Sequence, residues 1–300
     1  MQSVNETNEP LVSVVIATFN MGQYLPAAIE SVLAQTWKNL EVIVVDDGST
    51  DDTTQQMEQF EANGLVKYFR TENRGQPHAK NRGLKESGGH FIAFCDADDI
   101  WHPEKLCIQI PLFENEKTGV VYSEVSYIDQ HGNEVHRSQP YKRHSGKVTQ
   151  QLIMKNFVPF GTAVIRKECL TKNGYSNENL PMGIDWDLWL RFSVDWLFQY
   201  TSEKTYLYRV WPGQMSNNYR ARYKNAILIL ESFLNKYPDE IPKNLINRAW
   251  ADMYVNRGYT VACREKTLKE PLIDIMHGIY LDFNYVVAWK YLIKVLLRRI

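Results

Sequence analysis

No apolar run in the sequence is long enough to span a bilayer, and residues 1–10 lack the apolar core of a signal peptide. Cysteine is scarce as well, and the four cysteines, at positions 95, 107, 169 and 263, lack the close spacing of zinc sites and redox motifs. We therefore expect reduced thiols and a cytoplasmic protein.

Net charge is almost absent too. The 34 Lys and Arg residues nearly balance the 35 Asp and Glu residues, and the formal net charge is -1. Without an overall positive field the chain has no general attraction for nucleic acid, so we expect no nucleic-acid partner. The sequence also lacks a Gly-x-Gly-x-x-Gly turn, a Walker loop, a Gly-x-Ser-x-Gly elbow and a His-Glu-x-x-His pair. The usual sequence signatures of oxidoreductases, kinases and hydrolases are therefore missing.

Short apolar runs alternate with amphipathic segments in the first half of the chain. The pattern predicts strands at residues 11–18, 40–45, 66–70 and 90–95, and helices at residues 24–35, 51–63, 77–86 and 103–115. It loosens at residues 120–128, and short elements follow, one of them at 161–165. Such alternation is typical of an α/β fold, in which helices cover a mainly parallel sheet.

The second half of the chain is less regular. We expect a mobile loop at residues 131–147, a helix at 185–193 and an edge strand at 206–210. From residue 219 onward the apolar spacing is helical, with breaks expected near the residues Pro238, Pro242, Gly258 and Pro271. We predict an α/β domain over residues 1–215 and a C-terminal helical extension over residues 216–300.

Carboxylates gather where two predicted strands end. Asp96, Asp98 and Asp99 follow the strand at 90–95, and Asp46 and Asp47 follow the strand at 40–45. The carboxyl ends of parallel strands meet at one edge of an open sheet, where ligands commonly bind. Clustered carboxylates repel one another unless water or a cation compensates them, and hard oxygen ligands suit Mg²⁺ or Mn²⁺.

Four motifs, in order, resemble those of family 2 glycosyltransferases with the GT-A fold. They are Ser-Val-Val-Ile-Ala-Thr-Phe-Asn from Ser13, Val-Val-Asp-Asp-Gly-Ser from Val44, Asp-Ala-Asp-Asp from Asp96, and Asp-Trp-Asp-Leu-Trp-Leu-Arg from Asp185. The resemblance covers roughly residues 10–216. It implies a Rossmann-like GT-A fold and an enzyme of the type that builds bacterial cell-surface polysaccharides.

The resemblance also implies roles for individual residues. Asp98 is the expected metal contact, and Asp96 is expected beside the sugar and ribose of the donor. Asp47 is expected to accept a hydrogen bond from the N–H of a pyrimidine base, and Thr18 is expected to lie along the same base. Lys80 occupies a position where the family carries a basic residue near the phosphates, although a solvated helix lysine is an alternative.

Two of the clustered aspartates also fit structural roles. Asp46 fits a turn or helix-capping position, because the run that follows it, Asp-Gly-Ser-Thr-Asp-Asp, is typical of a helix entry. Asp99 fits a cap for the loop before Trp101.

Asp185 is the candidate catalytic base. A sugar hydroxyl must lose its proton as it attacks the anomeric carbon, and a carboxylate within hydrogen-bond reach can take that proton. Asp187 and Arg191 lie four residues apart, so we expect them to pair on the same helix. Trp186 fits either a core position or a surface that stacks on a sugar ring.

Two positions depart from the family pattern. Ile184 stands where the family commonly has Glu, and Trp211 stands where it often has His in a Tyr-Arg-x-His-Pro-Gly run.

The predicted function is an inverting, metal-dependent and non-processive transfer of one sugar, with a UDP-sugar favoured as donor. The expected acceptor is a hydroxyl of a glycan or of a lipid-linked molecule. The alternative is a catalytically silent protein that binds sugar nucleotides.

Residues 285–300 form an amphipathic, basic segment in which Lys290, Lys294 and Arg298 recur at intervals of four residues. Such a helix can lie among the headgroups of an anionic leaflet, which predicts a peripheral location at the inner face of the cell membrane. The alternative is a helix packed on its neighbours with its lysine side chains extended to water.

Overall fold

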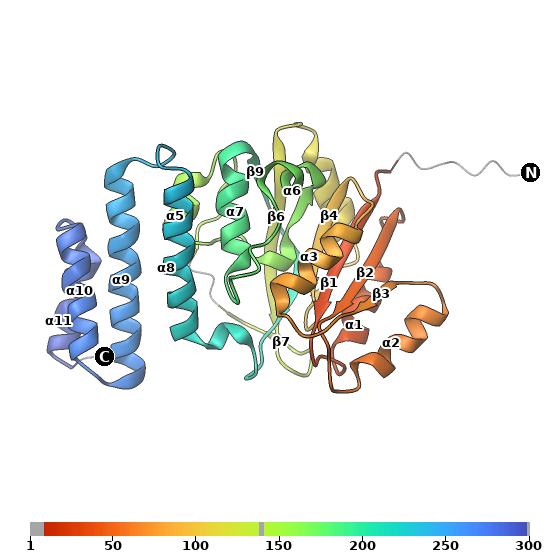
Figure 1. Cartoon of the computed structure of the whole chain (residues 1–300), viewed down its shortest axis with the longest axis horizontal. Coiled ribbons are helices and arrows are strands. Elements are labelled where there is room, and N and C mark those ends of the chain that lie inside the picture. The colour runs from red at the N-terminus through yellow and green to blue at the C-terminus, as the bar shows by residue number, and fades with distance from the viewer. Residues whose placement is uncertain (1–8, 138–140, 299–300) are drawn as a thin grey trace, which may run out of the picture. The chain divides into compact units, whose positions relative to one another are not determined.

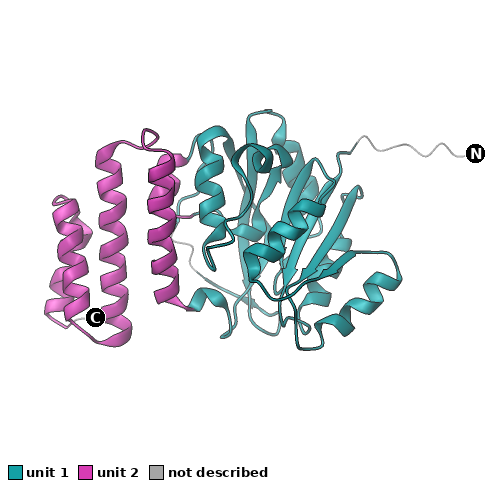
Figure 2. Ribbon diagram, in the orientation of Figure 1, with its two compact units in different colours: residues 1–148, 157–217 teal, residues 149–156, 218–300 magenta. Residues whose placement is uncertain are grey.

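The computed structural model describes residues 9–137 and 141–298 (Figure 1). The N-terminal segment, the centre of the predicted mobile loop at residues 138–140 and the last two residues of the predicted C-terminal helix lie outside the described residues. The chain forms two compact units (Figure 2). One contains residues up to 148 together with 157–217, and the other contains 149–156 and 218–300. The predicted domain boundary at residue 215 stays a prediction, because compactness is no test of independent folding.

Four parallel strands form one half of the sheet in the first unit. In spatial order they are β3 (Lys67–Arg70), β2 (Leu40–Asp46), β1 (Val12–Thr18) and β4 (Phe91–Asp96). The apolar side chains of β1, β2 and β4 are almost completely buried, as expected for parallel strands covered on both faces. The predicted parallel, helix-covered sheet is therefore confirmed for this half.

The register of these strands brings the acidic motifs together. Thr18 at the end of β1 is paired with Asp46 at the end of β2, and the neighbouring Ala17 is paired with Asp96 at the end of β4. The predicted meeting of the two acidic strand ends at one sheet edge is thus observed.

Three crossover helices connect the parallel strands: α1 (Leu25–Leu33), α2 (Thr53–Ala62) and α3 (Gln76–Glu86). The buried side chains of α1 share a core with Val12, Val14 and Ile16 of β1. Ala79 of α3 packs with Ile43 of β2 and its neighbour Val45 in a separate cluster. Because successive side chains of β2 point to opposite faces, α1 and α3 cover opposite faces of the sheet.

The sheet continues beyond β4 with strands of mixed direction. The order is β8 (Val164–Arg166), β6 (Thr118–Ile128), β9 (Leu197–Arg209) and β5 (Ile100–Trp101), and β7 (Glu134–Val135) pairs with β6. The prediction of an edge strand at residues 206–210 was wrong, since β9 pairs with both β6 and β5. Polar residues at 201–204 concealed its first half from the apolar pattern.

The predicted helix at residues 103–115 was too long. The structure has a short helix α4 (Lys105–Gln109) followed by a 3-10 turn η1 (Ile110–Phe113), because Pro111 has no N–H to continue the α-helical ladder. Three shorter elements complete the first unit: η2 (Phe160–Thr162), α6 (Lys167–Asn173) and η3 (Met215–Asn217). The predicted helix at 185–193 is observed as α7 (Ile184–Asp195).

The second unit is helical. It contains α5 (Thr149–Met154), α8 (Tyr219–Lys236), α9 (Lys243–Glu265), α10 (Lys269–Leu281) and α11 (Val286–Leu296). The predicted break at Gly258 was wrong, because α9 runs through it. A Cβ there would lie 2.8 Å from the carbonyl oxygen of Pro271, so the glycine permits close approach of α10. No helix within the described residues has the length and apolarity needed to span a membrane.

Candidate functional site

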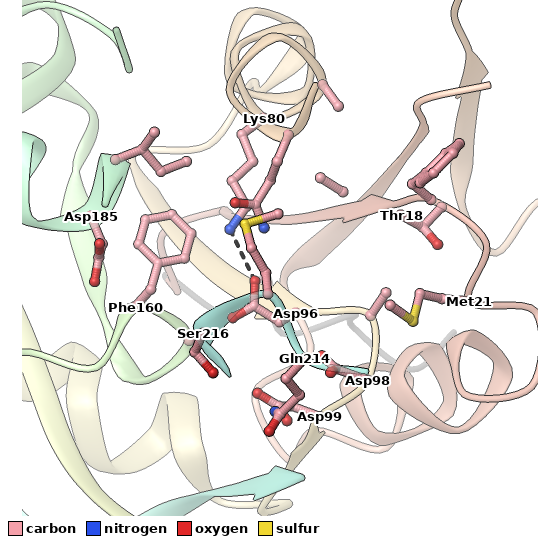
Figure 3. A pocket seen from close by; sticks show the side chains of 18 of the residues that line it. Thr18, Met21, Lys80, Asp96, Asp98, Asp99, Phe160, Asp185, Gln214 and Ser216 are labelled. Atoms are coloured by element: carbon pink, nitrogen blue, oxygen red, sulfur yellow. Dashed lines mark hydrogen bonds and ion pairs between the residues drawn. The ribbon is translucent and has the colours of Figure 1, made fainter. Parts of the chain in front are cut away.

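A cavity of about 620 Å³ opens where β1, β2 and β4 end, and η2, the start of α7 and residues 211–216 complete its wall (Figure 3). Its volume is in the range of small-molecule binding sites. The cavity wall includes every site residue that the sequence predicts: Thr18, Asp47, Lys80, Asp96, Asp98 and Asp185. Segments far apart in the chain therefore converge on one site.

Asp46, at the end of β2, is fully buried and has a structural role. Its carboxylate accepts hydrogen bonds from the N–H of Ser49 and from the hydroxyl of Tyr68, each at 2.8 Å. Burial, with a contribution from Asp46, raises the pKa of Tyr68 to about 12, so this phenol stays protonated as a donor. The turn role expected for Asp46 matches these contacts.

Asp47 faces the cavity but is also tied to the next loop. Its two carboxylate oxygens accept hydrogen bonds from the backbone N–H groups of Arg74 and Gly75, at 2.9 and 2.8 Å. Gly75 has a φ of 94°, which favours glycine, and α3 begins directly after it. These contacts hold the Asp47 carboxylate in one orientation at the cavity wall.

Thr18 contributes a buried hydroxyl to the same side of the cavity. The residue is 3% exposed, and its Oγ1 has no hydrogen-bond partner within the part of the chain that the structure describes. Its backbone carbonyl accepts the N–H of Asp47 at 2.9 Å. A buried hydroxyl without a partner is costly, and a ligand with a polar edge would satisfy it.

Lys80 and Asp96 form an ion pair of 2.9 Å between α3 and the end of β4 (Figure 3). The Lys80 ammonium also lies 3.7 Å from the centre of the Phe160 ring, and the residue is only 3% exposed. Lys80 is therefore not the solvated lysine of the alternative interpretation, because it directs its charge at a cavity carboxylate.

Asp99 connects β4 to β9 from a buried position. Its carboxylate accepts hydrogen bonds from the hydroxyl of Tyr206 at 2.8 Å and from the N–H of Arg209 at 2.6 Å. Burial raises the pKa of Asp99 well above its usual range, and the charges of Asp98 and Asp96 raise it further. The structural role expected for Asp99 fits these contacts.

Asp98 lies at the cavity wall between Asp96 and Trp211. Burial raises its pKa, and the charge of Asp96 raises it further, whereas a hydrogen bond from Trp211 lowers it. That hydrogen bond runs from the indole Nε1 to the carboxylate over 2.7 Å. The Arg209 guanidinium donates from Nε to the backbone carbonyl of Asp98 at 2.6 Å and so holds the loop.

The carboxylates at the end of β4 suit a hard divalent cation. In residues 9–137 and 141–298, no group of three or more His, Cys, Asp and Glu side chains is arranged to hold a metal on its own. Mg²⁺ is commonly held by one or two carboxylates together with substrate phosphates, so a larger group is not required. Burial and mutual repulsion raise the pKa values of Asp98 and Asp99, and a bound cation would stabilise their charged forms.

Asp185 reaches the cavity from the first turn of α7. The preceding Gly183 has a φ of 81°, and this left-handed residue turns the chain sharply into the helix. The adjacent Ile184 is 4% exposed and belongs to the apolar interior. Because Ile184 is apolar, Asp185 has no charged neighbour at the position where the family commonly has Glu.

Other side chains of α7 hold the helix in place. Asp187 and Arg191 form the expected pair at 2.7 Å, and Arg191 also donates to the carbonyl of Tyr175 at 2.9 Å. Trp189 is completely buried and donates to the carbonyl of Val158 at 3.2 Å, and Trp186 is 7% exposed. Both tryptophans are buried, so Trp186 has the core position that was one of its two expected alternatives.

Sequence analysis missed Tyr206, Phe160 and Gly161 as parts of the site. The Tyr206 hydroxyl donates to Asp99 and accepts the N–H of Asp96 at 3.2 Å. A Cβ on Gly161 would lie 1.9 Å from that hydroxyl, so only glycine fits there. The Pro-Phe-Gly-Thr run from Pro159 is a turn signal that could have drawn attention to this segment.

Comparison with known proteins identifies relatives of this chain. The model of the family described as glycosyl transferase family 2 matches residues 13–174. An uncharacterised glycosyltransferase of Rickettsia typhi is 30% identical over 235 residues, which are 77% of this chain and 73% of that protein. The Escherichia coli UDP-Glc:alpha-D-GlcNAc-diphosphoundecaprenol beta-1,3-glucosyltransferase WfaP is 39% identical over 113 residues, which are 38% of this chain and 45% of that protein.

Solved structures share the fold. S. aureus TarS in complex with UDP-GlcNAc is 20% identical with a TM-score of 0.60, and the match covers 93% of this chain and 91% of that chain. The mannosyltransferase PcManGT of Pyrobaculum calidifontis, in complex with GDP-Man and Mn²⁺, is 18% identical with a TM-score of 0.61, and the match covers 97% and 87%. At such low identities the solved structures show only that the fold is shared, whereas the family model shows similarity of sequence. The chain belongs to glycosyl transferase family 2, has the GT-A type of fold and is a glycosyltransferase.

Proposed function

We propose that this protein transfers a single sugar from a UDP-sugar to a hydroxyl of a glycan or lipid-linked acceptor, with inversion at the anomeric carbon and with help from a divalent cation. The observation that carries the proposal is the convergence of four chain segments on one cavity. That cavity combines carboxylates for a cation, a carboxylate for a base and polar groups for a nucleotide.

For the donor, we propose that Thr18 and Asp47 bind the nucleobase and that Asp96 and Lys80 bind the sugar and the phosphates. The unpartnered Thr18 hydroxyl and the oriented Asp47 carboxylate would meet the polar edge of a pyrimidine. Two similar proteins support uridine, since WfaP is named for UDP-Glc and a TarS structure contains UDP-GlcNAc. The ion pair places the Lys80 ammonium beside the Asp96 carboxylate, so the two side chains would contact adjacent parts of the donor.

For the cation, we assign Asp98 as the protein ligand for Mg²⁺ or Mn²⁺, next to Asp96. When bound, such an ion neutralises the charge that builds on a departing diphosphate. The mannosyltransferase PcManGT was solved with Mn²⁺, which supports a divalent ion in this fold. The hydrogen bond from Trp211 orients the Asp98 carboxylate, and Arg209 holds the backbone of the same residue.

For the chemistry, we assign Asp185 as the general base. The acceptor oxygen forms its bond to the anomeric carbon while the bond to the diphosphate breaks, and Asp185 takes the hydroxyl proton. Inversion is the expected outcome of one such displacement. The other carboxylates of the cavity wall are assigned to the donor, to the cation or, for Asp99, to a structural role, and the residues directly before Asp185 carry no nucleophilic side chain, so no second displacement is proposed.

For the acceptor, the name of WfaP points to a sugar carried on diphosphoundecaprenol, so a lipid-linked acceptor of polysaccharide biosynthesis is the favoured class. The sequence lacks the Gln-x-x-Arg-Trp motif of processive synthases. One sugar per acceptor visit is therefore part of the proposal.

The test is a donor screen with the full chain. UDP release is measured for a panel of UDP-sugars with Mn²⁺, and UDP binding is measured separately by calorimetry. We expect Asp185→Asn to keep UDP affinity and to lower UDP release by about 100-fold or more, because the base is lost. Asp239→Asn makes the same change at an exposed carboxylate of the second unit and should alter neither quantity.

The outcomes separate the hypotheses. Normal turnover by Asp185→Asn would refute the assignment of the base. If the wild type binds UDP and yet consumes no donor, even with undecaprenyl-linked acceptors, the protein is a silent sugar-nucleotide binder. The replacement of the usual His by Trp211 and of the usual Glu by Ile184 is the feature that favours this second function.

A further inference from the structure

Exposed apolar side chains are concentrated at the end of the second unit. Among the described residues, nine of the fifteen exposed large hydrophobic side chains lie between residues 273 and 297, on α10, on α11 and in the turn between them. Figure 2 shows these helices within the second unit. Single exposed hydrophobics are ordinary, but a concentration of this kind marks an interaction surface.

The helix α11 is apolar on two opposite sides. Ala288 and Val295 are completely buried against neighbouring helices. On the opposite side, Val286, Ile293 and Leu296 are 75%, 56% and 59% exposed, although a helix of a soluble protein normally presents polar residues there. An apolar side of a helix is normally covered, and within the described residues nothing covers this exposed side of α11.

The same exposure continues on α10 and through the turn. Ile273, Met276 and Tyr280 recur about once per turn of α10 and are 60%, 51% and 85% exposed. In the turn, Phe283 is 70% exposed, its ring lies 5.3 Å from that of Trp289, and its carbonyl accepts the Trp289 indole N–H at 2.9 Å. We call residues 273–298 with these exposed side chains the C-terminal apolar surface.

The acidic residues of this surface are paired with arginines, whereas its basic residues include a lysine that is unpaired within the described part of the chain. From residue 283 to the end, the sequence contains the basic residues Lys290, Lys294, Arg298 and Arg299 and no acidic residue. The acidic residues of α10 and of the following turn are all paired: Glu270 with Arg220, Asp274 with Arg257 and Asp282 with Arg248. Lys290 is exposed and borders the apolar side of α11, so positive charge beside the surface remains uncompensated.

We propose that the C-terminal apolar surface docks on the anionic leaflet of a membrane. The sequence predicts membrane contact through residues 285–300, and the structure extends the candidate surface to α10. Apolar side chains that enter the interface and basic residues that meet anionic headgroups are the two components of interfacial helix binding. A second copy of the chain is a poorer occupant, because a symmetric interface would bring two patches of the same charge together. The proposal is independent of the catalytic assignments.

The test is cosedimentation of the full chain with phosphatidylcholine vesicles, with and without phosphatidylglycerol. We expect binding to the anionic vesicles only, with an affinity that falls at high salt, since Debye screening weakens the charge contribution. The triple variant Val286→Ser/Ile293→Ser/Leu296→Ser should bind at least tenfold more weakly, because three apolar side chains no longer insert. Lys290→Glu should weaken binding to anionic vesicles as well.

Matched controls protect the interpretation. Leu65→Ser and Leu228→Ser change leucines with exposures of 46% and 45% elsewhere on the chain and should leave vesicle binding unchanged. Thermal unfolding of every variant is measured, and the exposed positions should leave Tm nearly unchanged. The proposal is wrong if anionic vesicles do not bind the wild type or if they bind the triple variant equally well. Equilibrium sedimentation showing a dimer that the triple variant abolishes would overturn it in favour of a self-interface.

Discussion

The carboxylates that follow β2 and β4 arrive at the same sheet edge in different states. Asp46 and Asp47 each accept two hydrogen bonds, from Ser49 and Tyr68 in one case and from the backbone of Arg74 and Gly75 in the other. At the end of β4, Asp99 and Asp98 also accept hydrogen bonds, from Tyr206, Arg209 and Trp211, but burial and mutual repulsion still raise their pKa values.

The difference shows how similar acidic motifs acquire different roles. Hydrogen bonds from Ser49 and from Tyr68 of β3 hold Asp46, and those from Arg74 and Gly75 hold Asp47, so these contacts of the β2 carboxylates stabilise the fold. At Asp98 and Asp99, burial and mutual repulsion disfavour the charged form despite the hydrogen bonds they accept, and perturbed carboxylates of this kind are typical of ligand sites. Removing a carboxylate should therefore have opposite consequences at the two strand ends.

The largest effect is expected for Asp98→Ala. We expect UDP release to fall by about 1,000-fold, in the range seen when a group that stabilises developing charge is removed. We also expect binding of UDP with Mn²⁺ to be lost, because the proposed ligand is gone. Thermal stability should stay equal or increase, since a repulsive buried charge is removed. Activity assays, calorimetry and thermal unfolding measure these three quantities, and a marked loss of Tm would contradict the comparison.

Asp46→Ala should act mainly on stability. The change leaves the buried Ser49 N–H and the Tyr68 hydroxyl without their acceptor, which should lower the free energy of unfolding by about 2–4 kcal/mol. Denaturant unfolding measures the loss. The folded fraction should still bind Mn²⁺ with UDP, and a selective loss of metal binding at unchanged stability would show that Asp46 belongs to the ligand site.

A smaller effect is expected for Trp211→Phe. The variant keeps the ring but removes the N–H that donates to Asp98, so the carboxylate loses its orientation. Partners of this kind commonly change metal affinity by about tenfold or more, and we expect Mn²⁺ affinity in the presence of UDP to fall by about tenfold. Trp250→Phe, in α9 outside the cavity, is the control. Unchanged Mn²⁺ affinity in Trp211→Phe would mean that the indole only packs.

The smallest effect concerns Lys105, a buried cation on α4. Burial lowers its pKa to about 7, and its Nζ donates to Gln109 Oε1 at 2.5 Å and to the carbonyl of Thr162 at 2.7 Å. Between pH 7 and its usual pKa the unfolded chain keeps a proton that the folded protein has lost, so stability rises with pH in this window.

Lys105→Met should lack that rise. The difference in the free energy of unfolding between about pH 6.5 and 8.5 should be smaller than in the wild type by about 1–2 kcal/mol, as measured by denaturant unfolding. Mn²⁺ affinity should be unaffected. If the Mn²⁺ affinity changes, the charge of Lys105 compensates that of the β4 carboxylates. The difference between the carboxylates at the ends of β2 and β4 would then be smaller than proposed.

Local patterns predicted the parallel half of the fold and the residues of the cavity. Buried strands such as β1 and β4 are continuous apolar runs, and turn residues mark where they end. The patterns failed where the conformation of a segment depends on residues that are distant in the sequence. Gly258 allows close helix packing instead of ending α9, and the polar first half of β9 is a strand because β6 pairs with it.

The sequence by itself determined which carboxylates reach the edge of the sheet, because the ends of parallel strands follow from apolar periodicity. Only the tertiary structure decided what each carboxylate meets there. Tyr206, Arg209 and Trp211 contact Asp99 and Asp98 across more than 100 residues of chain. Such partners depend on how strands pair in space, and local sequence carries no record of that pairing. The physical difference between a structural aspartate and a proposed metal ligand therefore lies in donors that only folding supplies.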